Sequence, residues 1–111
     1  MNQSLPQLQL ANGKEPLKVD LLHSKKAAMI LRALNHKLRQ QILKSIDEHQ
    51  KMTVTEIYVK LRLEQSVASQ HLAILRRAGI VITVREGKFI FYMVDYNRLE
   101  QVNQFVEQLV G

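Results

Sequence analysis

The most constraining feature of this sequence is a change of apolar spacing within one stretch, residues 64–94. In its first half, apolar residues recur every three or four positions, which is the spacing of one helix face. Gly79 follows where a glycine can end a helix in the left-handed conformation without a Cβ clash. Two β-rich runs, 80–84 and 89–94, then flank residues 85–88, Arg-Glu-Gly-Lys. The stretch predicts a helix followed by a hairpin with two cations at its tip.

The predicted helix has two chemically different faces. Its apolar face is expected to contact the core, whereas the opposite face carries short polar side chains. Glutamine can form two hydrogen bonds with adenine, and serine can bond several base edges or a phosphate. Such a helix, followed by a basic hairpin, is similar to the recognition helix and wing of a DNA-binding protein. The apolar positions are Ala68, Leu72, Leu75 and Ala78, and the polar ones are Gln65, Ser66, Ser69, Gln70 and Arg76.

The residues before this stretch predict three further helices. Thr53 and Glu56 have the spacing of a capping box, in which the two side chains satisfy free N–H groups at a helix start. The third helix and the recognition helix are joined by a short turn, and such a unit places its second helix in the DNA major groove. The first helix is expected to start between Val19 and Ser24 and to end at Leu34, the second to span about 37–49, the third 54–61 and the turn 62–64.

A last helix is expected from Arg98 to Val110, with its cap at residues 95–97. Its apolar stripe reaches the end of the protein and has to be covered. The stripe could pack on the first helix of its own chain. We favour a two-fold dimer seam formed by the first and last helices, because a two-fold protein matches a palindromic operator. The residues expected there are Leu21, Ala28, Leu31, Leu99, Val102, Phe105, Val106 and Leu109.

The first 18 residues differ in composition, being rich in glutamine, asparagine and leucine, with two prolines. We expect a flexible N-terminal tail over residues 1–18, either frayed or docked on a partner through its leucines. Residues 19–111 are expected to form one domain for DNA binding and dimerisation. The predicted fold is mainly α with a small β-hairpin, a winged helix-turn-helix of four helices, two strands and a fifth helix.

Composition and charge exclude several classes of function. The net charge of +6 suits a polyanionic partner. The absence of cysteine excludes disulfides, thiolate metal sites and cysteine nucleophiles. No apolar run approaches the roughly 20 residues that span a bilayer, and no secretory segment is apparent, so a cytoplasmic location without membrane contact is expected. Neither a nucleophile–base arrangement nor a phosphate-binding glycine loop is present, so an enzyme is not expected.

Four pieces of sequence, in this order and spacing, resemble the ArsR/SmtB family of bacterial transcriptional repressors. The resemblance covers about residues 28–94. It implies a homodimer of winged helices that binds double-stranded operator DNA, represses a promoter and is released by an inducer, a small molecule or a protein that the residues do not identify. The four pieces are residues 34–43, 54–57, 66–81 and 85–92.

The chain departs from the family pattern at several positions. Lys37 stands where the family usually has a proline, and Arg62 and Glu64 stand where it often has a glycine and a serine. Family members that sense arsenite or cadmium use cysteines near the third helix, and this chain has none. Members that sense zinc or nickel often use histidines on the last helix, which here carries only Glu100 and Glu107 as possible ligands. We therefore expect no metal, no cofactor and a non-metal signal.

Several candidate residues have two interpretations. His71 either touches a DNA phosphate or bridges the two helices of the motif. Thr53 and Thr55 either hold a phosphate at a helix start or only cap it. Arg39 and Arg77 either contact DNA or brace the fold. Arg85 and Lys88 suit the minor groove or the flanking backbone, and the full set of expected DNA-binding residues is Gln65, Ser66, Ser69, Gln70, His71, Arg76, Arg85, Lys88, Thr53 and Thr55.

The predicted function is that of a sequence-specific transcriptional regulator, most simply a homodimeric repressor. Two alternatives stay open. Winged helices also serve as protein-interaction modules, because a fold does not determine a function. A basic winged helix can also bind DNA without sequence preference, as an architectural protein does.

Overall fold

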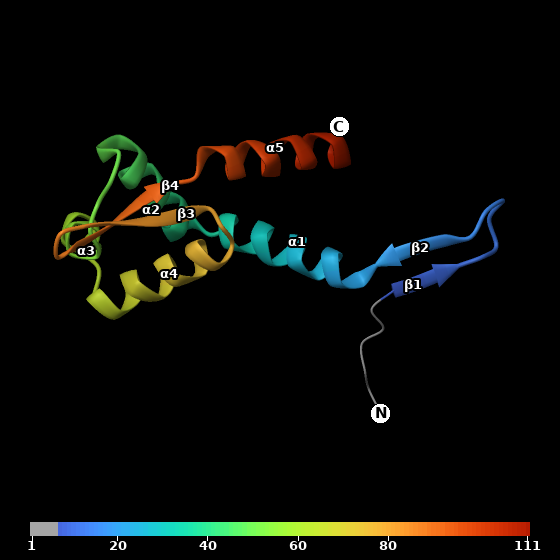
Figure 1. The fold of residues 1–111 in the computed structure, drawn as a ribbon, viewed down its shortest axis with the longest axis horizontal. Coiled ribbons are helices and arrows are strands. Elements are labelled where there is room, and N and C mark those ends of the chain that lie inside the picture. The colour runs from blue at the N-terminus through green and yellow to red at the C-terminus, as the bar shows by residue number, and fades with distance from the viewer. Residues whose placement is uncertain (1–6) are drawn as a thin grey trace, which may run out of the picture.

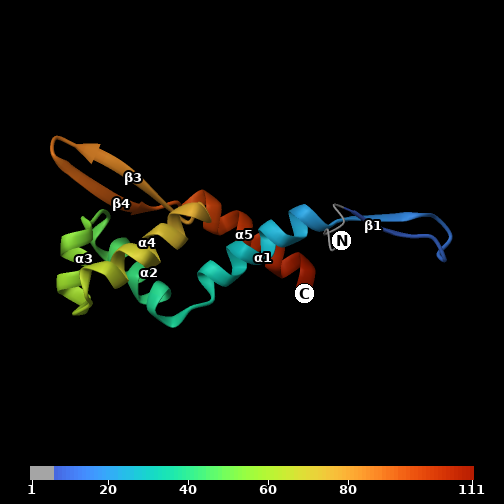
Figure 2. The ribbon, with the colours of Figure 1, turned by 90° about the horizontal axis from the view of Figure 1, so that it is seen from below.

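The computed structural model describes residues 7–111 as an elongated molecule, with principal dimensions of 56 × 37 × 27 Å (Figure 1). The helix-turn-helix body and the wing occupy one end, and an N-terminal hairpin projects from the other (Figures 1 and 2). The elements in order are β1 (Gln7–Leu10), β2 (Leu17–Asp20), α1 (Leu21–Leu34), α2 (Lys37–His49), α3 (Val54–Leu61), α4 (Gln65–Arg77), β3 (Val81–Glu86), β4 (Phe89–Val94) and α5 (Tyr96–Val110).

The core lies where α2, α3 and α4 meet the base of the wing. Ile42 and Ile46 of α2 lie one helical turn apart and are both fully buried. Leu72 and Leu75 of α4 face them from the recognition helix and are also fully buried. The burial of these residues therefore confirms the inward face of α4 that the amphipathic spacing predicted. Ile57 of α3 completes this core together with Ile80, Val81 and Ala78.

The boundaries of α1 to α4 agree with the expected ones, α5 begins at Tyr96 instead of Arg98, and α3 has the predicted capping box. The Thr53 hydroxyl accepts a hydrogen bond from the Glu56 N–H at 3.2 Å, and the Glu56 carboxylate accepts one from the Thr53 N–H at 2.9 Å. Arg62 ends this helix with a left-handed φ of 56°. A glycine would adopt that conformation without the cost that a Cβ imposes.

The wing is an antiparallel hairpin whose turn is shorter than expected. Strand β3 extends to Glu86, which pairs with Phe89, so only Gly87 and Lys88 form the turn. Gly87 has a φ of 61°, which suits a two-residue hairpin turn. Met52, in the loop before α3, exchanges two backbone hydrogen bonds with Tyr92 of β4, at 3.1 and 2.7 Å. This bridge ties the wing to the helical body.

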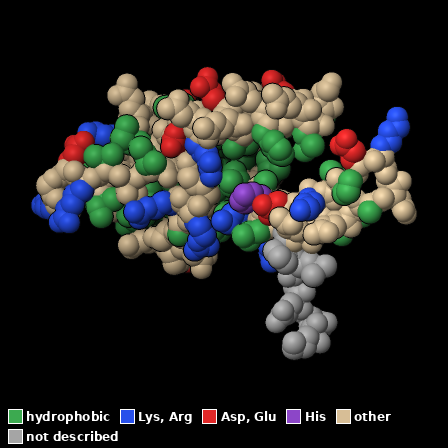
Figure 3. Space-filling view, turned by 45° about the vertical axis from the view of Figure 1, so that its right-hand side comes forward, with side chains coloured by type: hydrophobic (Ala, Val, Ile, Leu, Met, Phe, Trp, Pro, Cys, Tyr) green, Lys and Arg blue, Asp and Glu red, His purple; other side chains and the backbone are tan. Residues whose placement is uncertain are grey.

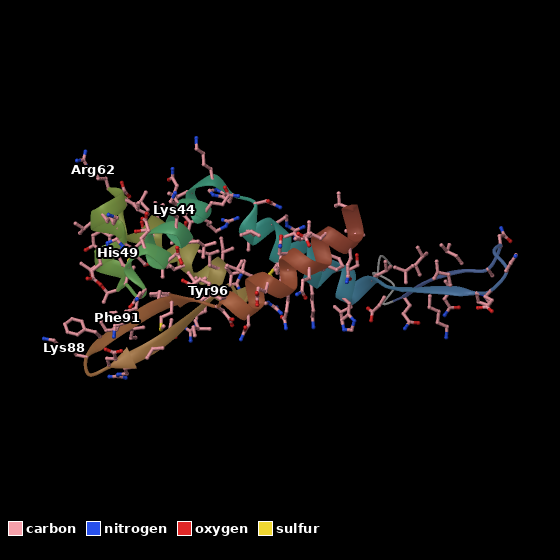
Figure 4. The ribbon with its side chains drawn as sticks, turned by 90° about the horizontal axis from the view of Figure 1, so that it is seen from above. Lys44, His49, Arg62, Lys88, Phe91 and Tyr96 are labelled. Atoms are coloured by element: carbon pink, nitrogen blue, oxygen red, sulfur yellow. The ribbon has the colours of Figure 1, made fainter. Side chains whose placement is uncertain are left out.

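Helix α5 is attached to the body mainly at its first turn. Asp95 caps it by accepting a hydrogen bond from the Arg98 N–H at 3.1 Å. The Arg98 guanidinium donates to the Ala78 carbonyl at the end of α4, at 3.2 Å. The Tyr96 hydroxyl, labelled in Figure 4, donates to Asp47 of α2 at 2.5 Å. Beyond this turn α5 and α1 border a common groove, and no residue of α5 is fully buried.

The stretch for which a flexible tail is expected, residues 1–18, contains paired strands where the structure describes it, while Met1–Pro6 lie outside the described residues. Strands β1 and β2 pair antiparallel there, from Gln7↔Asp20 to Leu10↔Leu17. Leucine alternates with glutamine over residues 7–10, and leucine and valine alternate with charged residues over 17–20. This period of two is typical of a strand, and Asn12-Gly13 lies in the loop between the strands. Within residues 7–111, no helix has the length and apolarity needed to cross a membrane.

The capping box provides a test of the local structure of α3. Thr53→Ala removes the acceptor for the Glu56 N–H, so we expect the free energy of unfolding to fall by about 1 kcal/mol. Urea denaturation followed by circular dichroism measures this change. Thr55→Ala, at an exposed position two residues later, is the matched control and should change stability by less than about 0.5 kcal/mol. Equal losses for both variants would contradict the capping role.

Candidate nucleic-acid interface

The first two turns of α4 present a polar surface on the side opposite the core. Gln65, Ser66, Ser69 and Gln70 are all exposed, whereas Ala68 and Leu72 on the other side of the helix are fully buried. No side chain caps the start of α4, so its first N–H groups have no side-chain partner at Glu64. The helix therefore offers side-chain amides, hydroxyls and backbone donors on one free surface.

The wing tip carries the two expected cations. Arg85 and Lys88 are both exposed, and the Arg85 Nε donates to the Gly87 carbonyl at 3.1 Å, which holds the guanidinium near the turn. The Lys88 ammonium lies 5.4 Å from the centre of the Phe89 ring. Lys88 stands at the end of the wing in Figure 4. The α3 end, the start of α4 and the wing tip all lie at the same end of the long axis (Figures 1 and 2).

A lysine outside the predicted set neutralises the acidic residue of the wing. The Lys51 ammonium is 2.6 Å from the Glu86 carboxylate and 4.7 Å from the centre of the Phe91 ring. Both side chains of the ion pair are partly exposed, so the pair adds little stability. The ion pair mainly cancels the negative charge of Glu86, so that Arg85 and Lys88 determine the electrostatic potential of the wing tip. The sequence held no periodic signal for this contact between residues 35 positions apart.

The two threonines of α3 have different surroundings. The Thr53 hydroxyl is engaged with Glu56, both as acceptor and as donor at 3.2 Å, which agrees with the capping interpretation. Thr55 is exposed. Both line a groove of about 700 Å³ between the start of α3 and β4, opposite Lys88 and Phe89. The fold thus brings the threonines close to the wing and leaves Thr55 the freer of the two.

Arg39 braces the fold. Its side chain is 9% exposed, its Nε donates to the Ala33 carbonyl at 2.7 Å, and its Nη2 donates to the Arg32 carbonyl at 2.9 Å. The remaining Nη1 lies 3.2 Å from His71 Nδ1 on the recognition helix. One guanidinium therefore joins the end of α1, the start of α2 and the middle of α4.

The ring of His71 joins α4 to Arg39 of α2 and not to α3, and a contact of His71 with DNA stays a prediction. Because arginine only donates, His71 Nδ1 accepts, and the ring is the neutral tautomer with its proton on Nε2. The ring lies 4.9 Å from that of His36, at 47°. Burial, and then the nearby charges of His36 and Arg39, lower the pKa of His71 below its usual 6.5. A neutral His71 is the form that this packing requires.

His36 has a structural role that the sequence reasoning missed. Its Nδ1 accepts hydrogen bonds from the N–H groups of Leu38 and Arg39, at 3.2 and 3.5 Å, and so caps α2. The available signal was its place directly before the first helical residue. Lys37, a departure from the pattern of the family that the sequence resembles, occupies the first position of that helix without interrupting it.

The remaining predicted residues are distributed along the molecule. Arg76 and Arg77 are exposed in the last turn of α4, which suits the negative end of the helix dipole. A rise of about 1.5 Å per residue puts Arg76 roughly 16 Å from Gln65 along the helix. The structure therefore separates Arg76 from the polar surface of the first two turns. Among residues 7–111, no group of three or more histidine and carboxylate side chains is placed to hold a metal ion.

Three of the residues predicted for the dimer seam line the space between α1 and α5. Leu31, Val102 and Phe105 border an apolar groove of about 160 Å³ between the two helices. Phe105 and Leu109 are 46% and 68% exposed, and Leu21, Ala28 and Val106 are half-buried. Leu99 differs from the others because it packs against the core of its own chain.

The lowered pKa of His71 predicts a pH dependence of stability. The unfolded chain takes up this proton more readily than the folded one, so stability is fully present above pH 6.5 and is lost as pH falls through the folded pKa. We expect the free energy of unfolding to decrease between pH 7.5 and 5.5, and His71→Gln to reduce that slope. Urea denaturation at several pH values measures it. The non-titrating control Gln70→Asn should retain the wild-type slope, and an unchanged slope in His71→Gln would contradict the assignment.

Comparison with known proteins shows the family of this chain. The family model described as "Bacterial regulatory protein, arsR family" matches residues 36–83. An HTH-type transcriptional regulator of Methanocaldococcus jannaschii is 37% identical over 76% of this chain and 94% of its own length. The transcriptional activator HlyU of Vibrio cholerae is 34% identical over 78% of this chain and 80% of its own.

Solved structures show the same fold. The structure of HlyU from Vibrio cholerae, 34% identical, covers 79% of this chain and 95% of its own, with a TM-score of 0.59. That of the transcriptional repressor PagR of Bacillus anthracis, 27% identical, covers 78% and 98%, with a TM-score of 0.63. The chain belongs to the arsR family of bacterial regulatory proteins and is a DNA-binding transcription regulator with a winged helix-turn-helix fold.

Proposed function

We propose that this regulator is a homodimeric repressor that reads a specific operator and leaves it in response to a non-metal signal. The observation that carries the proposal is the polar surface of α4, whose first two turns are exposed while the opposite side is fully buried. A helix with only this surface free fits the major groove, where each base pair presents a distinct pattern of donors and acceptors.

Base reading is assigned to the side chains of the first two turns. Gln65 and Ser69 lie four positions apart, as do Ser66 and Gln70, so the four side chains form one surface. An amide can bond an adenine edge with two hydrogen bonds, each such pair being worth about 1–3 kcal/mol of discrimination. This polar composition favours specific readout over purely architectural binding.

Phosphate contacts are assigned to the wing. Arg85 and Lys88 are exposed at its tip, and Lys51 neutralises the Glu86 carboxylate between them in the sequence. A charged hairpin tip can reach the minor groove or the flanking backbone. The net charge of +6 supports a strong and salt-dependent attraction to DNA.

The homodimer is supported by the apolar surface of α1 and α5. No residue of α5 is fully buried by its own chain, although the helix is amphipathic, and Phe105 and Leu109 are largely exposed. A two-fold partner would cover the same surface on both copies. It would also set two recognition helices about 34 Å apart, which is one turn of DNA.

A non-metal signal is proposed from the ligand chemistry of the chain. The sequence has no cysteine, and its last helix offers Glu100 and Glu107 without a histidine. Two carboxylates on their own are a poor transition-metal site. The signal would then release the protein from DNA by changing the spacing of the recognition helices or the position of the wing. The coupling free energy between signal binding and DNA binding would be about 1–3 kcal/mol.

Fluorescence anisotropy tests the proposed function directly. The DNA upstream of the gene that encodes this protein is compared with a scrambled duplex at two salt concentrations. We expect a preference for the first that persists at physiological salt, with affinities for both that fall steeply as salt rises. Equal, salt-sensitive affinities would indicate an architectural binder, and no binding to either duplex would favour a protein-interaction module.

Substitutions separate base reading from phosphate contact. Gln65→Ala or Gln70→Ala should lower the ratio of specific to non-specific affinity by about 10-fold, because each removes a base contact. Charge removal by Arg85→Gln with Lys88→Gln should weaken binding to all sequences alike and reduce the salt slope by about 2. Anisotropy titrations measure both effects. A glutamine variant that weakens every sequence equally would contradict base reading by α4.

A further inference from the structure

The N-terminal hairpin has one apolar face and one polar face. Paired residues of antiparallel strands point to the same side of a ribbon, and residues two apart along a strand share that side. The register pairs Leu8 with Val19 and Leu10 with Leu17. These four side chains therefore form a continuous apolar face, and the other face consists of Gln7, Gln9, Lys18 and Asp20.

This apolar face is uncovered within one chain. Leu8, Leu10 and Leu17 are 39%, 49% and 56% exposed. A hairpin of two strands is at best marginally stable in water, and it needs a surface on which to bury such a face. Figure 3 shows hydrophobic side chains at the surface both on this projecting hairpin and alongside α5. The segregation of the two faces indicates that something packs against the leucines.

The hairpin is joined to α1 without a linker. Asp20 is both the last residue of β2 and the cap of α1, because its carboxylate accepts from the His23 N–H at 3.0 Å. The other carboxylate oxygen lies 3.0 Å from the His23 ring. The direction of the hairpin is thus set by α1, and it carries its apolar face beyond the end of the helical body (Figures 1 and 2).

A matching uncovered surface lies at the same end of the molecule, on the last turns of α5. Phe105 and Leu109 lie four positions apart on one helix face and are 46% and 68% exposed, and Val110 is 80% exposed. Helices α1 and α5 cross in Figure 2, and the C-terminal end of α5 lies on the side of the molecule from which the hairpin projects (Figures 1 and 2). One chain therefore leaves two apolar surfaces open, both continuous with the proposed α1–α5 seam.

We propose that the N-terminal hairpin is an arm that packs its leucine face on the last turns of α5 of a second copy, around Phe105 and Leu109. This inference rests on the homodimer of the proposed function and extends its interface. Two-fold symmetry makes the exchange reciprocal, so two arms cover two helix ends and no such surface stays open. Each arm then lies against the partner copy at the end of the dimer remote from the wings.

Other occupants fit the hairpin less well. DNA is expected at the opposite end of a molecule that is 56 Å long. The described hairpin and its loop carry two cations, Lys14 and Lys18, and two carboxylates, Glu15 and Asp20, so they have no net attraction for a polyanion. Binding to an anionic membrane surface would also require an excess of positive charge. An uncharged apolar partner surface of the same chain is the better match.

Sedimentation equilibrium of the full-length protein tests the arm. Leu10→Ser with Leu17→Ser makes the apolar face polar, and Gln9→Ser with Lys18→Ser is the matched change on the other face. We expect the first pair to raise the dimer Kd by about 10-fold or more, because the leucines are lost in both copies, and the second to leave it unchanged. Circular dichroism of the variants verifies that the helical body stays folded.

The outcomes distinguish the arm from the dimer itself. A wild-type protein that stays monomeric at micromolar concentration, with and without DNA, would overturn both proposals. A stable wild-type dimer whose Kd is the same in the leucine variant would overturn the arm alone.

Cross-linking identifies which copy the arm contacts, and the chain has no cysteine of its own to interfere. A chain with both Leu10→Cys and Leu109→Cys is treated with a short bis-maleimide. Formation of a covalent dimer, absent from each single variant, supports packing on the second copy. A cross-link within one chain would overturn the proposal, since the arm would then fold back on its own α5.

Discussion

The guanidinium of Arg39 holds α4, the proposed recognition helix, in place relative to the rest of the protein. A charged group that is almost completely buried is tolerated only when its donors are satisfied. Here the acceptors are two carbonyls at the end of α1 and one ring nitrogen of His71 on α4. The orientation of the recognition helix is therefore linked by one side chain to the helix proposed for the dimer seam.

A second link joins the other end of α4 to α5. The Arg98 guanidinium donates to the Ala78 carbonyl and lies close to Gly79, where the chain leaves the helix with a φ of 76°. A Cβ at this position would approach the Arg98 side chain to 3.2 Å. Glycine is thus needed here both for the left-handed turn and for the close approach of α5. Any displacement of α5 would therefore also displace the C-terminal end of α4.

The sequence predicted the helices well because their signals are local. Capping residues and apolar periodicity act within one or two turns, and the structure reproduces both in α3 and α4. The N-terminal hairpin was missed because a composition typical of a tail concealed alternating leucines at positions 8 and 10.

Contacts between distant residues were beyond sequence reasoning. His71 and Arg39 are 32 positions apart and Lys51 and Glu86 are 35 apart, and neither pair has a local pattern. The sequence left His71 with two interpretations for this reason, and only the packing of three helices places it against Arg39. The polar residues of α4 were found because they are defined by a single helix face. Their role toward DNA and the dimer seam stay predictions.

The bridge between Met52 and Tyr92 fixes one point of the wing to the helical body and leaves the tip farther from that point than the base. Two backbone hydrogen bonds fix the ribbon at this point. Between this bridge and the turn, β4 has three residues, 89–91, which span about 10 Å at the usual rise of a strand. A small rotation about this bridge would displace the tip cations more than the base of the wing. The distance from this bridge to the tip thus limits how far Arg85 and Lys88 can move toward a groove of the proposed DNA partner without disturbing the helical core.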